Sequence, residues 1–366
     1  MTAKRTPLYE THLSYGGRMV EFGGWSLPVQ YSGIKEEHLA VRTKAGLFDV
    51  SHMGEFLVTG KDALDFLQKV VTNDVARLQE NQILYSPMCY NDGGTVDDLL
   101  IYKYSAEQYL AVVNAANIDK DWAWMEENQA GFAVTLENLS DQTAQLALQG
   151  PLAKNILVNL TEAPLADLTY YWFWPEVIIA GKKVLLSRTG YTGEDGFELY
   201  CDPEDAAELW EAIMEVGKPM GLLPAGLGCR DTLRFEVCFP LYGHELTAEI
   251  TPIEAGIGFF VKVDKENFNG KEVLAKQKQT GPRRKLVGIE MVGRGVARAE
   301  YPVFCGEARI GQITTGSYGP SLDKNLGLAL INSAYTQIGQ ELFVEIRGKK
   351  IAAQVISKPF YKREEK

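Results

Sequence analysis

Six short apolar segments follow Gly281 and limit what the last quarter of this 366-residue chain can fold into. Each is rich in β-branched or aromatic residues, and turn residues separate it from the next, a pattern typical of all-β architecture. The segments are LVGIEMV, YPVFC, ARIGQITTG, LGLALIN, LFVEIRG and KKIAAQVIS. This series predicts a small C-terminal β-barrel or sandwich.

A domain boundary is predicted at Gln279–Leu286 (QTGPRRKL), where Gly-Pro is followed by a basic run. We therefore assign residues 1–280 to an N-terminal region and 281–366 to the C-terminal β domain. Before this boundary, predicted helices and strands do not alternate strictly, which favours an α+β fold with mostly antiparallel sheets. A chain of this length suits two or three domains.

Hydrophobic periodicity predicts the main elements of the N-terminal region. The predicted helices are Ile34–Thr43, Asp62–Val71, Asp119–Asn128, Asp205–Val216, Gly270–Lys276 and the part of Leu222–Glu236 from about Cys229. The predicted strands include Glu55–Thr59, Ala144–Gln149, Ile257–Val263, a hairpin over Val177–Tyr200, and a three-stranded antiparallel meander made of Ile83–Tyr90, the run after Asp98, and Tyr109–Asn114.

Bulk composition excludes several classes of protein. The net charge of −11 argues against a nucleic-acid partner. No apolar run is long enough to span a bilayer, and the N-terminus lacks the apolar core of a signal peptide. The five cysteines are scattered without a C-x-x-C, so we expect a reducing, cytoplasmic location. The four scattered histidines give no reason to expect a metal site.

Charge is distributed unevenly along the chain. Residues from Gly281 onward carry 14 Lys/Arg and 8 Asp/Glu, a net of +6, whereas the first 280 carry 23 and 40, a net of −17. The asymmetry suggests a separate C-terminal module with an anionic ligand or partner, or it is the ordinary variation of charge along a chain.

The stretch Asn91–Tyr102 (NDGGTVDDLLIY) places two acids at the start of an apolar strand. Asp92-Gly93-Gly94 is a hairpin turn signal. Since neighbouring side chains on a strand point to opposite faces, only one of Asp97 and Asp98 can face a given pocket. The motif alone leaves open whether either acid is chemical or merely closes a turn.

A second stretch, Arg188–Leu199 (RTGYTGEDGFEL), runs from a strand through a glycine-rich loop into another strand. Its glycines either let a flat ligand approach or simply permit a tight turn. We expect Glu194 and Asp195 to be solvated at the loop tip. Glu198 stands between Phe197 and Leu199, so it must find donors, and a heterocycle with adjacent N–H groups is a suitable partner.

A third stretch, Gly226–Glu236 (GLGCRDTLRFE), places Arg230 and Arg234 four residues apart on one helix face. They can grip a ligand carboxylate or pair with acids on neighbouring elements. The chain contains no phosphate-binding loop, zinc-protease motif, nucleophile elbow or dinucleotide fingerprint. General acid–base chemistry would then fall on carboxylates or tyrosine.

Taken together and in order, these motifs closely resemble the glycine cleavage T-protein family of aminomethyltransferases. The matching stretches run over nearly the whole chain. They are GGW (Gly23–Trp25), LFDVSHM (Leu47–Met53), GGTVDD (Gly93–Asp98), RTGYTGEDGFE (Arg188–Glu198), GLGCRDTLR (Gly226–Arg234), ITPIEAGIG (Ile250–Gly258) and KPFYKR (Lys358–Arg363).

The resemblance implies a fold of three domains, two of them interleaved in the N-terminal region, arranged as a cloverleaf around a central opening for tetrahydrofolate. It implies transfer of a one-carbon unit from the aminomethyl-lipoyl arm of the H protein to tetrahydrofolate. The products would be 5,10-methylenetetrahydrofolate, ammonia and the dihydrolipoyl H protein. No metal is implied, because folate itself supplies the nucleophile at N5.

The resemblance also implies the site residues. The family's catalytic aspartate matches Asp98, and its asparagine sixteen residues further on matches Asn114. Glu198 matches the acid for the aminopyrimidinone edge of the pterin. The other matching positions are Tyr85 and Tyr191 at the folate pocket, Arg230 near the glutamate tail, and Tyr361 or Arg363 at the C-terminus. On this reading Arg234 is structural, and Asp97 lies on the opposite side of its strand from the pocket.

Four alternatives are less consistent with the sequence. Related folate-dependent demethylating enzymes carry a flavin domain for which the chain has no motif. An iron–sulfur repair relative has K-G-C-Y-x-G-Q-E where this chain has RTGYTGED. A silent folate-binding protein would not need Asp98, Glu198 and Arg230 together. A carboxylate-pair hydrolase would need two acids facing one bond, which adjacent strand residues do not provide.

Overall fold

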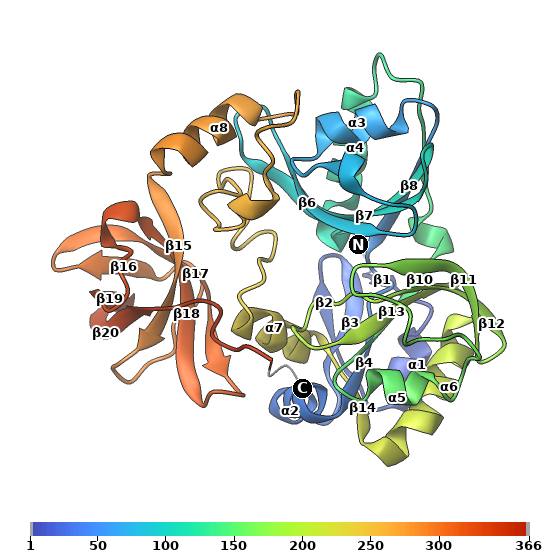
Figure 1. Ribbon diagram of the computed structural model, residues 1–366. Coiled ribbons are helices and arrows are strands. Elements are labelled where there is room, and N and C mark those ends of the chain that lie inside the picture. Colours follow the sequence, from blue (N-terminus) through green and yellow to red (C-terminus); the bar gives the residue numbers. More distant parts are fainter. Residues whose placement is uncertain (1–2, 364–366) are drawn as a thin grey trace. The chain divides into compact units, whose positions relative to one another are not determined.

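The computed structural model describes residues 3–363 and contains three open sheets and a closed barrel. Nearly all strand pairs are antiparallel; the exceptions are β1 with β3 and β14 with β4. Helices are interspersed among the strands of the N-terminal region (Figure 1). The predicted α+β class with mostly antiparallel sheets is confirmed.

The chain divides into two compact units. The first contains the described residues up to Leu67, Val75–Tyr85 and Leu99–Leu233, and the second contains Gln68–Asp74, Ser86–Asp98 and the described residues from Arg234 onward. The expected boundary at Gly281 falls between α8, which ends at Thr280, and β15, which begins at Arg284. The barrel is thus one part of the second unit.

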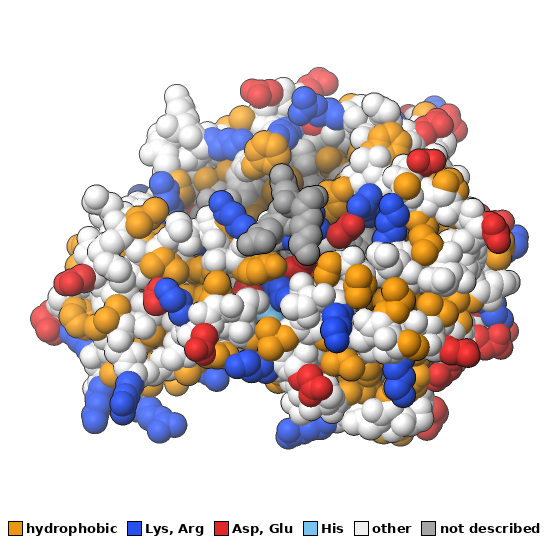
Figure 2. All heavy atoms as spheres, turned by 60° about the horizontal axis from the view of Figure 1, so that its bottom comes forward, with side chains coloured by type: hydrophobic (Ala, Val, Ile, Leu, Met, Phe, Trp, Pro, Cys, Tyr) orange, Lys and Arg blue, Asp and Glu red, His pale blue; other side chains and the backbone are white. Residues whose placement is uncertain are grey.

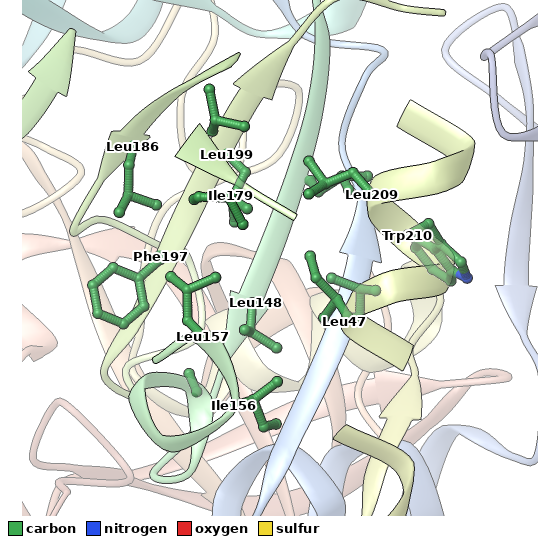
Figure 3. Close-up of a cluster of buried hydrophobic side chains, with 14 of the residues drawn as sticks. Leu47, Leu148, Ile156, Leu157, Ile179, Leu186, Phe197, Leu199, Leu209 and Trp210 are labelled. Atoms are coloured by element: carbon green, nitrogen blue, oxygen red, sulfur yellow. The ribbon is translucent and has the colours of Figure 1, made fainter. Parts of the chain in front are cut away.

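A six-stranded sheet forms the centre of the first unit, in the order β11-β12-β13-β10-β4-β14. Its strands are β4 (Ala45–Asp49), β10 (Ala144–Gln149), β11 (Phe173–Ile179), β12 (Lys182–Ser187), β13 (Gly196–Cys201) and β14 (Leu222–Pro224). Helices α5 (Ala153–Leu157) and α6 (Ala206–Gly217) cover one face. Figure 3 shows Leu148, Phe197 and Leu199 among the side chains that form the core on this face.

The other face of this sheet contains fewer apolar side chains. Helix α2 (Ile34–Thr43) and the first turns of α7 (Leu227–Glu236) pack there through a smaller cluster. Its members are Val41, Phe48, Val50, Ala147, Ala225, Cys229 and Leu233. The space beside this cluster is where polar strand residues gather.

A five-stranded sheet has the order β6-β7-β8-β5-β9. Its strands are β5 (Gly54–Thr59), β6 (Ile83–Cys89), β7 (Thr95–Ser105), β8 (Gln108–Val113) and β9 (Thr135–Asn138), with helices α3 (Ala63–Val70) and α4 (Ile118–Asn128) following β5 and β8. The predicted meander is confirmed as β6-β7-β8. Within the first unit, Tyr102 of β7 packs against Phe173 and Tyr200 of the six-stranded sheet.

A small N-terminal sheet has the order β1-β3-β2. It consists of β1 (Lys4–Arg5), β2 (Arg18–Phe22) and β3 (Trp25–Gln30), and helix α1 (Tyr9–Ser14) lies between β1 and β2 in the chain. The buried His12 of α1 hydrogen-bonds to Asp49 of β4 at 2.8 Å and to the Tyr31 hydroxyl at 2.8 Å. These polar contacts fasten the N-terminal segment to the six-stranded sheet.

The C-terminal segment forms a closed six-stranded barrel in the order β15-β18-β17-β16-β19-β20, which decides between the predicted barrel and sandwich. The strands are β15 (Arg284–Met291), β16 (Pro302–Cys305), β17 (Ala308–Gly319), β18 (Lys324–Asn332), β19 (Glu341–Ile346) and β20 (Lys349–Ile356). Its core contains Ile289, Ile313, Ile331 and Val344, all fully buried. Helix α8 (Lys271–Thr280) precedes it.

The strand predicted at Ile257–Val263 is wrong. This run contains the 3₁₀ helix η5 (Gly258–Phe260), after Gly256 at φ +82°. The Ile257 amide bonds to the Pro252 carbonyl, and the Phe260 amide bonds to the Ile257 carbonyl, so the backbone turns rather than extends. Phe259 is 75% exposed, and the Lys262 ammonium lies 4.0 Å from its ring centroid.

Charged side chains of both signs are interspersed over the surface drawn in Figure 2. Ion pairs at the surface of the protein include Lys324 with Glu290 and Lys350 with Glu307, each at 2.8 Å. Exposed pairs of this kind contribute about 1 kcal/mol at most. Within residues 3–363, no helix has the length and apolar content needed to cross a bilayer.

Candidate active site

Strand β13 presents its side chains alternately to the two faces of the six-stranded sheet. Phe197 and Leu199 point into the apolar core, so Glu198 points to the opposite face. There it lies across from Ala147 of β10 and Ser187 of β12. Glu198 stands between two apolar residues in the sequence because side chains alternate along the strand: Phe197 and Leu199 point to the apolar face of the sheet and Glu198 points to the polar face.

Glu198 is almost completely buried and has a specific donor. The Thr189 hydroxyl donates a hydrogen bond to its Oε2. Burial raises the pKa of Glu198, while the Thr189 bond, the charge of Arg230 and the Gln145 amide oppose that rise. A carboxylate that retains free acceptor positions in such a setting is a strong site for N–H groups.

Buried polar side chains from three further strands continue from Thr189. The Thr189 and Ser187 hydroxyls are 2.6 Å apart, and the Tyr102 hydroxyl lies 3.2 Å from Ser187 Oγ. The Tyr200 hydroxyl is 2.8 Å from that of Tyr102 and 3.0 Å from Gln145 Nε2. We call Gln145, Tyr200, Tyr102, Ser187, Thr189 and Glu198 the polar chain. All six members are buried.

The loop that leads to Glu198 is held by two ion pairs, and the expectation that both Glu194 and Asp195 are solvated is wrong for Glu194. The Glu194 side chain is 2% exposed, and its Oε1 accepts from Arg42 at 2.9 Å. Asp195 is half-buried and accepts from Nε and Nη2 of the Arg188 guanidinium, at 2.9 and 2.7 Å. Both acids therefore help to hold the loop, Glu194 away from water and Asp195 with its side chain still 30% exposed.

Two glycines in this loop are explained by packing. A Cβ on Gly190 would lie 1.9 Å from Gln149 Oε1, and one on Gly196 would lie 2.5 Å from Gln149 Nε2. The Gln149 side chain occupies that space and bonds to the Thr189 carbonyl and the Thr192 hydroxyl at 3.0 and 2.9 Å. Glycine is required at both positions because a side chain would collide with the buried Gln149 amide. The approach of a ligand is therefore not needed to explain these glycines.

Arg230 projects from α7 toward the same region. Its guanidinium lies 4.7 Å from the ring centroid of Tyr191, a cation–π geometry. It also lines a small hollow together with Phe48, Asp49 and Leu227. The structure thus brings together three of the predicted residues within the first unit, Tyr191, Glu198 and Arg230.

His52 lies close to Arg230 and is buried. Burial first, and the charge of Arg230 second, lower the pKa of His52 to about 4, against the opposing effect of Asp49. Its imidazole is therefore neutral at pH 7. Arg230 thus contributes the positive charge to this part of the unit, and His52 does not.

Arg234, one turn further along α7, has a different environment. Its guanidinium donates to Glu245 at 2.9 Å and to the Thr315 hydroxyl at 3.2 Å, and both side chains of the ion pair are at most 1% exposed. This agrees with the structural role expected for Arg234. Of the two predicted partners, a ligand carboxylate or an acid of a neighbouring element, Arg234 binds the acid Glu245.

Asp97 and Asp98 are unequal, as strand alternation requires. Asp97 is completely buried and Asp98 is half-buried on the opposite face of β7. The preceding turn is the predicted one: the Tyr90 amide bonds to the Gly94 carbonyl at 2.8 Å, the Gly94 amide bonds to Asp92 Oδ1 at 3.0 Å, and Gly93 has φ +87°.

The remaining predicted residues lie on separate elements. Tyr85 is half-buried in β6, and Asn114 is half-buried directly after β8, where it precedes a 3₁₀ turn. Tyr361 is half-buried, and its amide bonds to the Glu236 carbonyl at 2.8 Å, whereas Arg363 is exposed. Asp98, Tyr361 and Arg363 belong to the second unit, so a common site for all eight residues stays a prediction.

Metal ligation has no structural support in the part of the chain described. Among residues 3–363, no three His, Cys, Asp or Glu side chains gather where they could hold a metal ion. All five cysteines are free thiols, and burial raises the pKa of Cys89, Cys201 and Cys229. These thiols are therefore packing residues rather than nucleophiles.

Comparison with known proteins identifies the family. The GCVT N-terminal domain matches residues 8–265, and the glycine cleavage T-protein C-terminal barrel domain matches residues 284–362. This chain belongs to the glycine cleavage T-protein family. Curated relatives include aminomethyltransferases of Halalkalibacterium halodurans, 60% identical over 98% of both chains, and of Anoxybacillus flavithermus, 58% identical over 98% of this chain and 99% of the relative.

The fold agrees with that assignment. The crystal structure of glycine cleavage system aminomethyltransferase T from Bartonella henselae superposes with a TM-score of 0.92 at 35% identity, covering 98% of each chain. The resemblance inferred from the ordered motifs is therefore confirmed, and this chain has the architecture of an aminomethyltransferase of the T-protein family.

Sequence reasoning missed most of the polar chain. Ser187 and Thr189 lie within or beside the RTGYTGEDG stretch but carry no signal of their own, since hydroxyl residues are common in loops. Tyr102 and Tyr200 look like ordinary aromatic strand residues. Their period-two spacing from Asp98 and Glu198 does place each on the same strand face as that acid, and this was the one usable signal.

Proposed function

We propose that this chain transfers the one-carbon unit of the aminomethyl group on the lipoyl arm of the H protein to tetrahydrofolate. The products are 5,10-methylenetetrahydrofolate, ammonia and the dihydrolipoyl H protein. Family membership supports the reaction class. The observation that carries the choice of acceptor is Glu198, a buried carboxylate beside Tyr191 and Arg230.

The residues of the first unit fit the chemistry of a reduced folate. The pterin edge presents adjacent N–H groups, and Glu198 offers acceptor oxygens in a desolvated setting. Tyr191 offers an aromatic face, and Arg230 a guanidinium suited to the carboxylates of the glutamate tail. Tyr85 and Asn114 are proposed as further folate contacts, and Tyr361 or Arg363 as a contact from the C-terminal segment.

Asp98 is proposed as the catalytic residue. In the reaction, the bonds from the transferred carbon to sulfur and to the amine nitrogen break, and bonds to N5 and N10 of folate form. The two protons lost from N5 and N10 end on the sulfur and on the departing ammonia. A half-buried carboxylate can relay one of them and stabilise the cationic one-carbon centre during the transfer.

The decisive experiment is a reconstituted assay with lipoylated H protein carrying the aminomethyl group. We expect ammonia and 5,10-methylenetetrahydrofolate to form in equal amounts, and only when tetrahydrofolate is present. Asp98→Asn should lower turnover at least about a hundredfold while folate still binds. Asp97→Asn, the matched control on the other face of β7, should have a much smaller effect.

Two results would count against this function. One is wild-type protein that releases no ammonia from charged H protein with tetrahydrofolate. The other is an equal, mild effect of Asp98→Asn and Asp97→Asn, which would remove Asp98 from the chemistry. A cytoplasmic location is part of the proposal and is supported by the free state of the cysteines.

A further inference from the structure

The polar chain has only one arrangement of protons when Glu198 is ionised. A carboxylate only accepts hydrogen bonds, so Thr189 must donate to Glu198. Each hydroxyl has a single proton, so Ser187 must then donate to Thr189, and Tyr102 to Ser187. The direction of every bond therefore follows from the Glu198 end.

The opposite end of the polar chain requires the same direction. With Tyr102 donating to Ser187, Tyr200 must donate to Tyr102, and the Tyr200 oxygen must accept from its other neighbour. That neighbour is Gln145 Nε2, an amide nitrogen that only donates. Five hydrogen bonds thus point toward one carboxylate oxygen, and each of the four hydroxyls donates once and accepts once.

Protonation of Glu198 at Oε2 would disrupt this order. Thr189 would then accept from Glu198, and its own proton would lose the carboxylate as acceptor, because Ser187 already directs a proton at Thr189. Either one hydroxyl proton of the polar chain is left without an acceptor, or the hydroxyls reverse until Tyr200 and Gln145 Nε2 direct protons at each other. The polar chain consequently stabilises the ionised form of Glu198 more than the hydrogen bond from Thr189 would by itself.

The charges around the polar chain are consistent with an ionised Glu198. Burial raises the pKa of Glu198, and Arg230 is the cation whose charge opposes that rise. Burial raises the pKa of Glu55 of β5, which lies near enough to act on Tyr200, well above its usual value. His52 is neutral at pH 7, and burial together with the charge of Glu198 raises the pKa of Tyr102.

We propose that Thr189 is a positioning residue for folate binding, and that the polar chain behind it holds Glu198 as an ionised, acceptor-only group for the N–H edge of the pterin. This inference rests on the function proposed above. It makes the site specific for a heterocycle edge of adjacent donors, and it assigns to Ser187, Tyr102, Tyr200 and Gln145 a role that acts through Thr189.

The first test is the pH dependence of folate binding, measured by calorimetry with 5-formyltetrahydrofolate as a stable probe. Thr189→Val removes the hydroxyl at similar volume, and Thr189→Ser retains it. We expect Thr189→Val to move the midpoint of the binding profile upward by about one to two pH units, the scale of a hydrogen bond to a charged group. Above the new midpoint its affinity should return to within about threefold of wild type, since one pH unit is tenfold in protonation.

Thr189→Ser should bind like wild type at every pH, because it still donates to Glu198. A merely structural role for Thr189 predicts something else: an equal loss of affinity at all pH values, shared by both variants. That result would overturn the inference. Should Thr189→Val fail to fold, Ser187→Ala is the second variant: it removes the bond to Thr189 and leaves the bond from Thr189 to Glu198 in place. The pH midpoint of folate binding must then still move upward, by a smaller amount.

A second measurement does not depend on folate. Infrared titration of the free protein, with the spectrum of Glu198→Gln subtracted, reports the carboxyl band of Glu198. In Thr189→Val its midpoint should rise by the same one to two pH units. If wild type binds no folate but the band still shifts, the proposed function fails and the action of the polar chain on Glu198 stands. If folate binds and neither midpoint moves, the proposed function stands and this inference is refuted.

Discussion

The Arg42–Glu194 pair gives the most direct test of how the glycine-rich loop is held. Its side chains are 4% and 2% exposed, and Arg42 Nη1 also donates to the Thr192 carbonyl at 2.6 Å. Glu194→Ala removes the carboxylate that lies 2.9 Å from Arg42 Nη1 and so breaks this buried pair. Breaking a buried pair in this way costs about 3–5 kcal/mol.

The matched control lies one residue away. Asp195 pairs with Arg188, but the two side chains are 30% and 24% exposed, so solvent can replace the lost partner. Asp195→Ala should therefore cost about 1 kcal/mol or less, the value for accessible pairs. Adjacent acids in one loop are thus expected to differ severalfold in their effect on stability.

Thermal unfolding followed by circular dichroism would measure both variants. For a unit of this size, each kcal/mol shifts Tm by about 2–4 °C. Glu194→Ala should lower Tm by about 6–20 °C, and Asp195→Ala by about 4 °C at most. Equal shifts in the two variants, or a larger one for Asp195→Ala, would refute the reasoning from burial.

Three further outcomes are expected. Glu198→Ala should weaken folate binding rather than the chemical step alone, and calorimetry that finds unchanged affinity would count against its pterin role. Lys265→Met should lower the free energy of unfolding in urea by at least about 3 kcal/mol, because the carbonyls of Gln68, Val71 and Asn73 each lose a bond of 2.7–2.8 Å from its ammonium. Burial raises the pKa of Asp49, but its bonds from His12, Thr6 and Ser51 outweigh burial, so the pKa is lowered. The contribution of Asp49 to stability is therefore complete above its ordinary pKa of 3.8 and is lost as pH falls through the lower folded value. In this acid range, the free energy of unfolding of Asp49→Asn should depend less steeply on pH than that of wild type.

Elements with strong local signals could be predicted from the sequence. The barrel strands alternate and are bounded by turn residues, and α2 coincides with the predicted helix Ile34–Thr43. The strand prediction for Ile257–Val263 was wrong. The β-branched and aromatic residues of this run suggest a strand, whereas backbone hydrogen bonds over Pro252–Phe260 fold it into turns. Tertiary context overrides propensity most easily in such short segments.

The site shows a sharper limit to prediction. Glu198 could be singled out because an acid between Phe197 and Leu199 contradicts the local apolar pattern. The polar chain behind it could not be read in the same way, because β7 and β10 supply Tyr102 and Gln145 from far along the chain. The burial of Glu194 was mispredicted for the same reason, since Arg42 is 152 positions away.

Glu55 shows why an acid in an apolar strand is not by itself a functional signal. Like Glu198, it lies in a strand of the first unit and is almost fully buried. Both of its carboxyl oxygens lack a hydrogen-bond partner among the described residues, and burial alone raises its pKa. Glu198 has a donor, a nearby guanidinium and an ordered row of hydroxyls behind it. The partners of each acid, and not its burial, therefore distinguish Glu55 from Glu198, which is held ready to accept.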